Sequence, residues 1–198
     1  PDFIVTPRYW ISRTEVEERL CKRDSDGRII WQWERDWFMG WRNITNATNE
    51  RSFISAVISR VGVGHSMPLW FLETPPTHSA AFLANMTALL FDYVVRQKLG
   101  GTNMTFGYYK QFPVLPPEHY TEADLAFIVP RVLELTYTAH DLSGWAQDLG
   151  YGGEPFPFDP DRRATLRAEL DAYYAKLYGL TRDELRYILD PADVMGAD

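Results

Sequence analysis

The stretch SAAFLANMTALLFDYVVRQKLGG, residues 79–101, marks where the hydrophobic pattern of the chain changes. Its larger apolar side chains are spaced so that they share one face of a helix: Phe82, Met86, Leu89, Leu90, Tyr93 and Val94. Arg96 and Lys98 suit the carboxyl end of a helix dipole, and Gly100 with Gly101 is a typical helix stop. The stretch therefore predicts one continuous helix.

Upstream of this helix the pattern is typical of short strands joined by tight turns. Ser12 and Thr14 each precede a glutamate by three residues, which predicts a capped helix that ends near Cys21. Runs rich in β-branched and aromatic residues predict strands at residues 29–33, 53–58 and 67–72, and a further strand is predicted downstream of the helix at residues 104–109. The even spacing of the tryptophans favours packing in the core over a base-stacking surface: Trp31, Trp33, Trp37 and Trp41.

The proline-rich stretch FPVLPP, residues 112–117, cannot lie inside a helix and predicts a boundary. Beyond it the pattern is helical, with one helix from Thr121 to about Thr138, one marked by residues 166–177, and one after the capping box Thr181 to Glu184. The predicted fold class is α+β. We expect a small mixed sheet with helices in residues 1–117, followed by a helical support region in residues 118–198.

Charge divides at the same boundary. The net charge of −7 separates into +2 for residues 1–113 and −9 for residues 114–198. An acidic pI of about 5.1 ordinarily argues against nucleic acid as a partner, but here the objection falls on the second half. One cysteine excludes an internal disulfide and fits a reducing, cytoplasmic compartment, and no apolar run is long enough to span a membrane. The start lacks an initiator methionine, which suggests a piece of a longer chain.

The sequence contains no recognisable active site of its own. Its four histidines are scattered and only Cys21 could assist them, so no metal is expected. Gly62 and Gly64 form half of a phosphate-binding motif whose remainder is missing. The serine-hydrolase pattern Gly-x-Ser-x-Gly is also missing.

Binding chemistry is concentrated in residues 41–60 and in the turn after Lys98. Arginine and asparagine read guanine and adenine edges through paired hydrogen bonds, whereas lysine mostly registers phosphate charge. We expect five residues to read bases and three to position the DNA backbone, in that order: Arg42, Asn46, Asn49, Arg51, Arg60, and then Lys98, Asn103, Lys110. The alternative is a polar turn whose asparagine and threonine side chains cap their own backbone.

Four segments resemble a known family. They are RNITNATNERSFISAVI (42–58), residues 91–117 with FDYVVRQKLGGTN and YKQFPVLPP, FIVPRVLELTYTA (127–139), and LRAELDAYYAKLYGLTRDELRYILDP (166–191). Together they resemble the C-terminal region of Eco57I-like restriction-modification enzymes, which are adenine-specific DNA methyltransferases with a fused target-recognition domain. The resemblance covers most of the chain from about Trp41 onward.

The resemblance implies that the chain binds duplex DNA and positions it for an upstream methyltransferase domain of the same protein. That domain would use S-adenosylmethionine to methylate adenine at N6. The family's catalytic Asn-Pro-Pro-Tyr is absent here, because Pro75-Pro76 and Pro116-Pro117 lack the flanking asparagine and aromatic residue. We therefore expect no catalysis and no cofactor in this chain itself, and no membrane as a partner; whether the parent also cleaves DNA is left open.

Two other interpretations come from different functional classes. In the first, the chain is a protein-interaction scaffold of a multi-domain defence protein, its acidic helices dock on other domains, and its first half binds no DNA. In the second, weaker interpretation, the chain is an independent enzyme with an unrecognised site.

Overall fold

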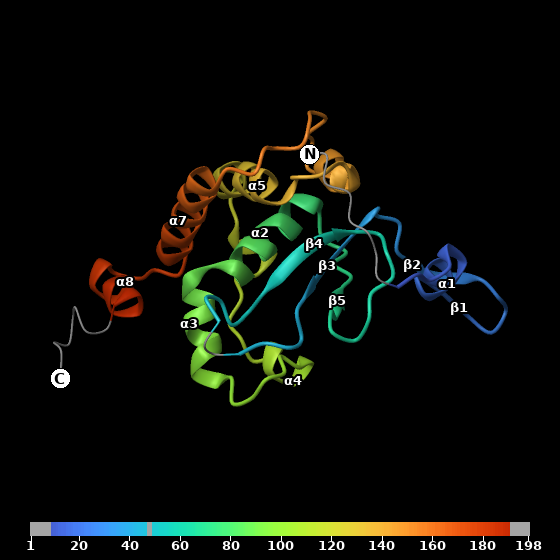
Figure 1. The fold of residues 1–198 in the computed structure, drawn as a ribbon, viewed down its shortest axis with the longest axis horizontal. Helices are drawn as coiled ribbons and strands as arrows, with labels where there is room; N and C mark the ends of the chain where they lie inside the picture. Colours follow the sequence, from blue (N-terminus) through green and yellow to red (C-terminus); the bar gives the residue numbers. More distant parts are fainter. Residues whose placement is uncertain (1–8, 47–48, 191–198) are drawn as a thin grey trace.

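Eight α-helices and five short strands make up the described part of this computed structural model, residues 9–46 and 49–190 (Figure 1). The strands form one sheet of three and one of two, and the helices cover one side of the larger sheet and continue beyond it. The α+β prediction is confirmed. Every strand pair in the described residues is antiparallel, so the sheet is not mixed in direction.

The three-stranded sheet has the order β4-β3-β5, with β3 (Trp37–Trp41) between β4 (Ser55–Ser59) and β5 (Leu69–Trp70). All five residues of β3 are buried, and Trp33, Trp37 and Trp41 are at most 4% exposed, which confirms the core interpretation for these tryptophans. A Cβ atom on Gly40 would lie 2.3 Å from the carbonyl oxygen of Pro68. Glycine therefore permits the close approach of the chain before β5.

A small unit projects from one side of this sheet, at the right of Figure 1. It consists of α1 (Arg13–Arg19) and the hairpin of β1 (Cys21–Arg23) and β2 (Ile29–Gln32). The Ser12 side chain accepts a hydrogen bond from the Glu15 backbone N–H at 3.1 Å, as the capping pattern predicts.

The single helix predicted for residues 79–101 is wrong, because two helices meet there. Helix α2 (Pro76–Thr87) ends at Ala88, whose ψ of 145° is extended, and α3 (Leu89–Lys98) begins directly after it. The first N–H of α3, on Leu89, donates to Asp171 Oδ1 at 2.6 Å. Since this cap comes from a residue more than 80 positions away, no local pattern could reveal the break.

The strand predicted at residues 104–109 is also wrong, since α4 (Phe106–Tyr109) is a helical turn. Met104 alone is held in extended pairing: its N–H donates to the Asn43 carbonyl, and its own carbonyl accepts from Trp41 Nε1 at 2.8 Å. The strand predicted at 53–58 is present as β4, but it is half-buried, and the one predicted at 67–72 shortens to β5.

The second half is helical, as predicted. It comprises η1 (Pro117–His119), α5 (Glu122–Thr136), η2 (His140–Leu142), α6 (Ser143–Asp148), α7 (Pro160–Leu177) and α8 (Arg182–Leu189). Both predicted caps, Thr121 and Thr181, form complete capping boxes.

One hydrophobic core joins the two halves. Helix α5 packs on α2, and the buried Tyr174 hydroxyl of α7 donates to the Ala81 carbonyl of α2 at 2.6 Å. The core therefore continues across residue 117. That residues 1–117 recognise DNA and residues 118–198 support them stays a prediction. None of the described helices combines the length and hydropathy that crossing a bilayer requires.

Candidate nucleic-acid interface

The chain after β3 alternates between buried and exposed side chains. Trp41, Asn43 and Thr45 are at most 4% exposed, whereas Arg42, Ile44 and Asn46 point outward. Extended backbone puts alternate side chains on opposite faces, so the three outward residues form one row. The inward residues are anchored: the Asn43 carbonyl and the Thr45 N–H both pair with the chain after α3.

That second segment adds another predicted residue to the row. The Thr45 N–H donates to the Thr102 carbonyl at 2.9 Å, the Met104 N–H donates to the Asn43 carbonyl at 2.7 Å, and Ile44 and Asn103 form an antiparallel bridge. Residues opposite one another in such a pair share a face, and Asn103 is exposed. We call the outward surface of Arg42, Ile44, Asn46 and Asn103 the polar platform.

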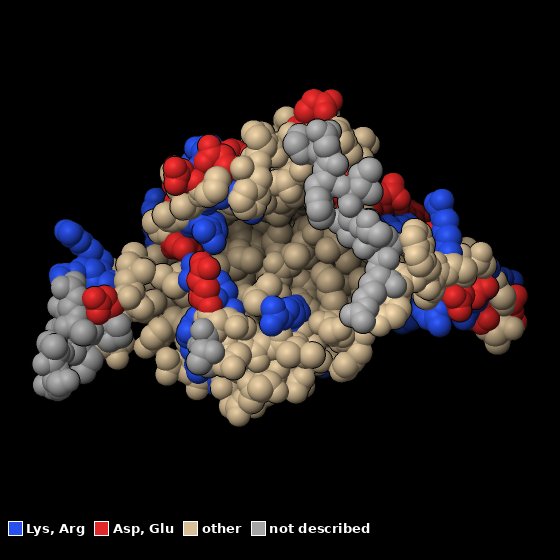
Figure 2. Space-filling view, viewed as in Figure 1, with Lys and Arg blue, Asp and Glu red and all other residues tan. Residues whose placement is uncertain are grey.

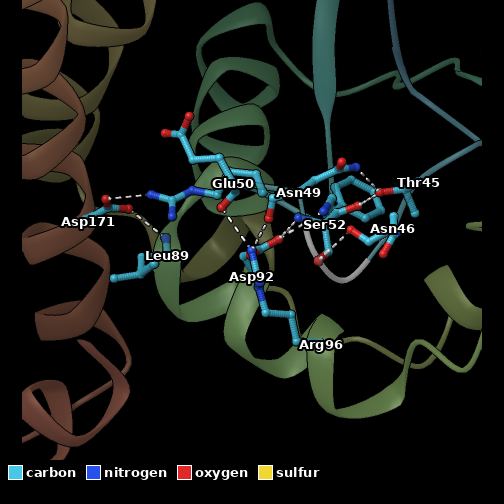
Figure 3. A network of polar contacts seen from close by, with 11 residues as sticks. Thr45, Asn46, Asn49, Glu50, Ser52, Leu89, Asp92, Arg96 and Asp171 are labelled. Carbon is cyan, nitrogen blue, oxygen red and sulfur yellow. Dashed lines mark hydrogen bonds and ion pairs between the residues drawn. The ribbon is translucent and has the colours of Figure 1, made fainter. Parts of the chain in front are cut away.

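A buried carboxylate fixes the loop that follows the platform (Figure 3). Asp92 of α3, 2% exposed, accepts the backbone N–H groups of Ser52 at 2.6 Å and Phe53 at 2.9 Å through Oδ1. Its Oδ2 accepts from Arg96 Nε at 2.8 Å. The same arginine donates to the carbonyls of Asn49 at 2.6 Å and Glu50 at 2.9 Å. One ion pair therefore satisfies four backbone groups of the loop, so the described part of the loop is held in place.

The remaining predicted residues of this region differ in exposure. Lys98 at the end of α3 and Lys110 after α4 are exposed, and both helix ends lie at the same end of the molecule as the chain after β3 (Figure 1). Asn49 is half-buried, and its amide donates to Thr45 Oγ1 at 3.4 Å. That contact fits the alternative reading of a side chain that supports its own turn.

Arg51 and Arg60 lie at opposite ends of β4, and both are in ion pairs. Arg51 contacts Asp171 of α7 at 3.2 Å, and burial raises the pKa of that carboxyl although the arginine opposes the shift. Arg60 pairs with Glu17 of α1 and also donates to the Arg35 carbonyl. The structure thus brings Arg42, Asn46 and Asn103 together, and it directs Arg51 and Arg60 toward other elements.

The sequence analysis did not predict two exposed apolar residues of this region, one within the platform and one beside it. Ile44 is 55% exposed within the platform itself. Phe106 is 51% exposed and packs edge-on against the buried Trp41, with ring centroids 4.9 Å apart. The run at 104–109 was expected to be a strand, which hid the position of Phe106 at the start of a helical turn.

A metal site can be assessed only among the residues that the structure describes. In residues 9–46 and 49–190, no three His, Cys, Asp or Glu side chains are grouped so that they could hold a metal ion. Comparison of the chain with known protein families, curated proteins and solved structures found no match.

Proposed function

We propose that this chain is the target-recognition part of a site-specific adenine-N6 DNA methyltransferase, binding duplex DNA through the polar platform. The observation that carries the proposal is the shared outward row of Arg42, Asn46 and Asn103 on two extended segments that pair with each other. The resemblance of residues 42–58 and 91–117 to Eco57I-like enzymes supports it, because these two segments form the platform.

The platform has the chemistry that base reading requires. An arginine can donate two hydrogen bonds to guanine O6 and N7, and an asparagine can pair with adenine N6 and N7. Ile44 adds an apolar contact of the kind that recognises a thymine methyl group. Lys98 and Lys110 supply positive charge for phosphates at the same end of the molecule.

Asp92 and Arg96 order the loop that follows the platform before DNA arrives. Because they fix the backbone of residues 49–53, little conformational freedom of that segment remains to be lost on binding. In this proposal the methyl transfer from S-adenosylmethionine belongs to a separate catalytic domain of the parent protein in the cytoplasm, and this chain selects the DNA sequence.

Duplex binding measured against salt concentration tests the proposal. Fluorescence anisotropy with a labelled 30-base-pair duplex should give a log-log slope of about −2 if Lys98 and Lys110 each neutralise one phosphate. Lys98→Ala should reduce the slope by about one. The matched control is Arg182→Ala, which removes an exposed cation of α8, a helix that contributes no residue to the platform. Absence of salt-dependent binding at 50 mM KCl would favour the scaffold interpretation instead.

A further inference from the structure

Within the described residues, strand β4 pairs with another strand along one edge only. It is the outer strand of the order β4-β3-β5, and its register sets Ser59 opposite Trp37 and Ser55 opposite Trp41. The Arg42 N–H donates to the Ile54 carbonyl, and the Arg60 N–H donates to the Asp36 carbonyl. The backbone N–H and C=O groups of the even-numbered residues of this strand therefore point toward β3. In an antiparallel ladder the alternate residues face the other way. The N–H and C=O groups of Ser55, Val57 and Ser59 therefore point to the open edge.

A groove follows this edge from end to end. A cavity of about 330 Å³ is lined by residues 55–57 of β4 together with apolar side chains of α2, α5 and α7. A second cavity, of about 1010 Å³, continues along residues 57–62 and is lined on its far side by residues 139–142. The two cavities share Val57. Figure 2 shows this side of the molecule as a hollow with an uncharged floor, and charged side chains gather on its rim.

The two ends of the groove differ in charge. Arg51, Arg163 and Arg167 line the end near Ser55, against one acidic residue, Asp171. At the Ser59 end the acidic residues outnumber the arginines by three to two: Glu17, Asp36 and Asp141 against Arg13 and Arg60. A ligand that lies along β4 should therefore carry its negative charge at the Ser55 end.

Two groups at this basic end have unused hydrogen-bonding capacity. The Ser55 hydroxyl is buried, and no residue in the described part of the chain gives it a hydrogen-bond partner. Arg163 donates to the Leu135 carbonyl and stacks on Phe158, and its partial burial lowers the pKa of the guanidinium. A buried polar group without a partner is costly, so an incoming acceptor at this end relieves a cost already present.

We propose that this groove binds an extended peptide of another polypeptide, which adds to β4 as a fourth, antiparallel strand with its acidic carboxyl end at Arg163 and Arg167. Backbone hydrogen bonds to residues 55, 57 and 59 would supply affinity, and alternate side chains would enter the apolar floor. Strand β4 is about 17 Å long, which matches five peptide residues. Because α5 and α7 wall the groove, it forms a slot for one chain. This inference does not depend on the proposed DNA binding.

The test uses a fluorescein-labelled peptide, Lys-Val-Thr-Val-Thr-Val-Glu, with a free carboxyl terminus. We expect saturable binding by anisotropy, together with slowed hydrogen exchange at the Val57 and Ser59 amides. The same peptide N-methylated at alternate residues should bind at least tenfold more weakly, because it cannot form the ladder. This comparison leaves the protein unchanged, so it does not depend on any variant folding.

Protein variants locate the site. Ser55→Pro removes one outward N–H without touching the ladder to β3, and it should weaken binding about tenfold relative to its matched control Ser55→Ala. The Arg167→Glu variant should bind the original peptide more weakly than a peptide in which the terminal lysine and glutamate have exchanged places. Equal binding of the N-methylated peptide, or equal binding by Ser55→Pro and Ser55→Ala, would overturn the proposal. So would self-association of the protein that Ser55→Pro abolishes, since a second copy would then occupy the edge.

Discussion

Arg42 and Arg51 lie nine residues apart in one polar segment, yet they differ in their surroundings. Arg42 is exposed, and its guanidinium Nε donates to the nearby Ile44 carbonyl at 2.6 Å. Arg51 is half-buried and contacts Asp171, which also caps α3. The sequence assigns both residues to DNA because they are the same residue type in the same stretch. The difference shows that a neighbouring carboxylate, contributed from a distant helix, decides whether an arginine is available to a ligand.

The largest effect should come from the residue that holds the loop beside the platform. Asp92→Asn leaves Arg96 without its ionic partner and weakens two short hydrogen bonds from Ser52 and Phe53. Breaking a buried ion pair typically costs about 3 to 5 kcal/mol. Urea unfolding should show a loss of this order, and DNA binding should weaken as well because the loop loses its anchor. An unchanged midpoint would mean that Asp92 does not organise the loop.

In the helical region, the stability lost on truncating a side chain should follow how deeply that side chain is buried. Leu170 is 5% exposed in the core shared with α2, whereas Leu177, seven residues later on the same helix, is half-buried. Leu170→Ala should cost about 2 to 5 kcal/mol and Leu177→Ala clearly less. Thermal denaturation of the two variants measures the difference. Equal losses would contradict the packing of α7 described above.

Features held by partners close in the sequence could be predicted, and features held by distant partners could not. Caps such as Ser12, Thr121 and Thr181 lie within three residues of their partners, so local patterns revealed them correctly. The buried tryptophans were likewise predictable from hydrophobicity and spacing. The break at Ala88 could not be predicted, because Asp171 supplies its cap. The pairing that aligns Arg42 with Asn103 also joins segments 60 residues apart.

A direct comparison of Arg42 with Arg51 follows from their different surroundings. In the full-length parent, Arg42→Ala should cost about 1 to 3 kcal/mol of DNA binding and relax one position of the target sequence. Arg51→Ala should leave the target unchanged and lower stability by at most about 1 kcal/mol, because its ion pair is partly exposed. Methylation mapping of genomic DNA from cells that carry each variant checks the target. If Arg51→Ala relaxes the target and Arg42→Ala does not, the platform is misassigned.

The smallest expected effect is on the pH dependence of stability. Two aspartates of the helical half should contribute to it in opposite directions. The Thr121 hydroxyl, the Tyr173 hydroxyl and the Thr121 N–H donate to Asp124, and these hydrogen bonds lower the pKa of its carboxyl. An acid whose pKa is lower in the folded state stabilises the fold above its unfolded pKa, near 4, and this stabilisation is lost as the pH falls through the folded value. Burial shifts the pKa of Asp171 in the opposite direction, so acidification does not remove stability through that group.

Replacing Asp124 isolates this contribution. Asp124→Asn should lower the melting temperature slightly at pH 7 and flatten its decline below pH 4, because the variant has no carboxylate to protonate there. The matched control is Glu122→Gln in the same helical turn, whose carboxylate receives no hydrogen bond from Thr121 or Tyr173. That control should keep the acid-dependent decline of the parent protein. If Asp124→Asn loses stability on acidification as steeply as Glu122→Gln does, the capping box of α5 contributes nothing to acid sensitivity, and other carboxylates must account for it.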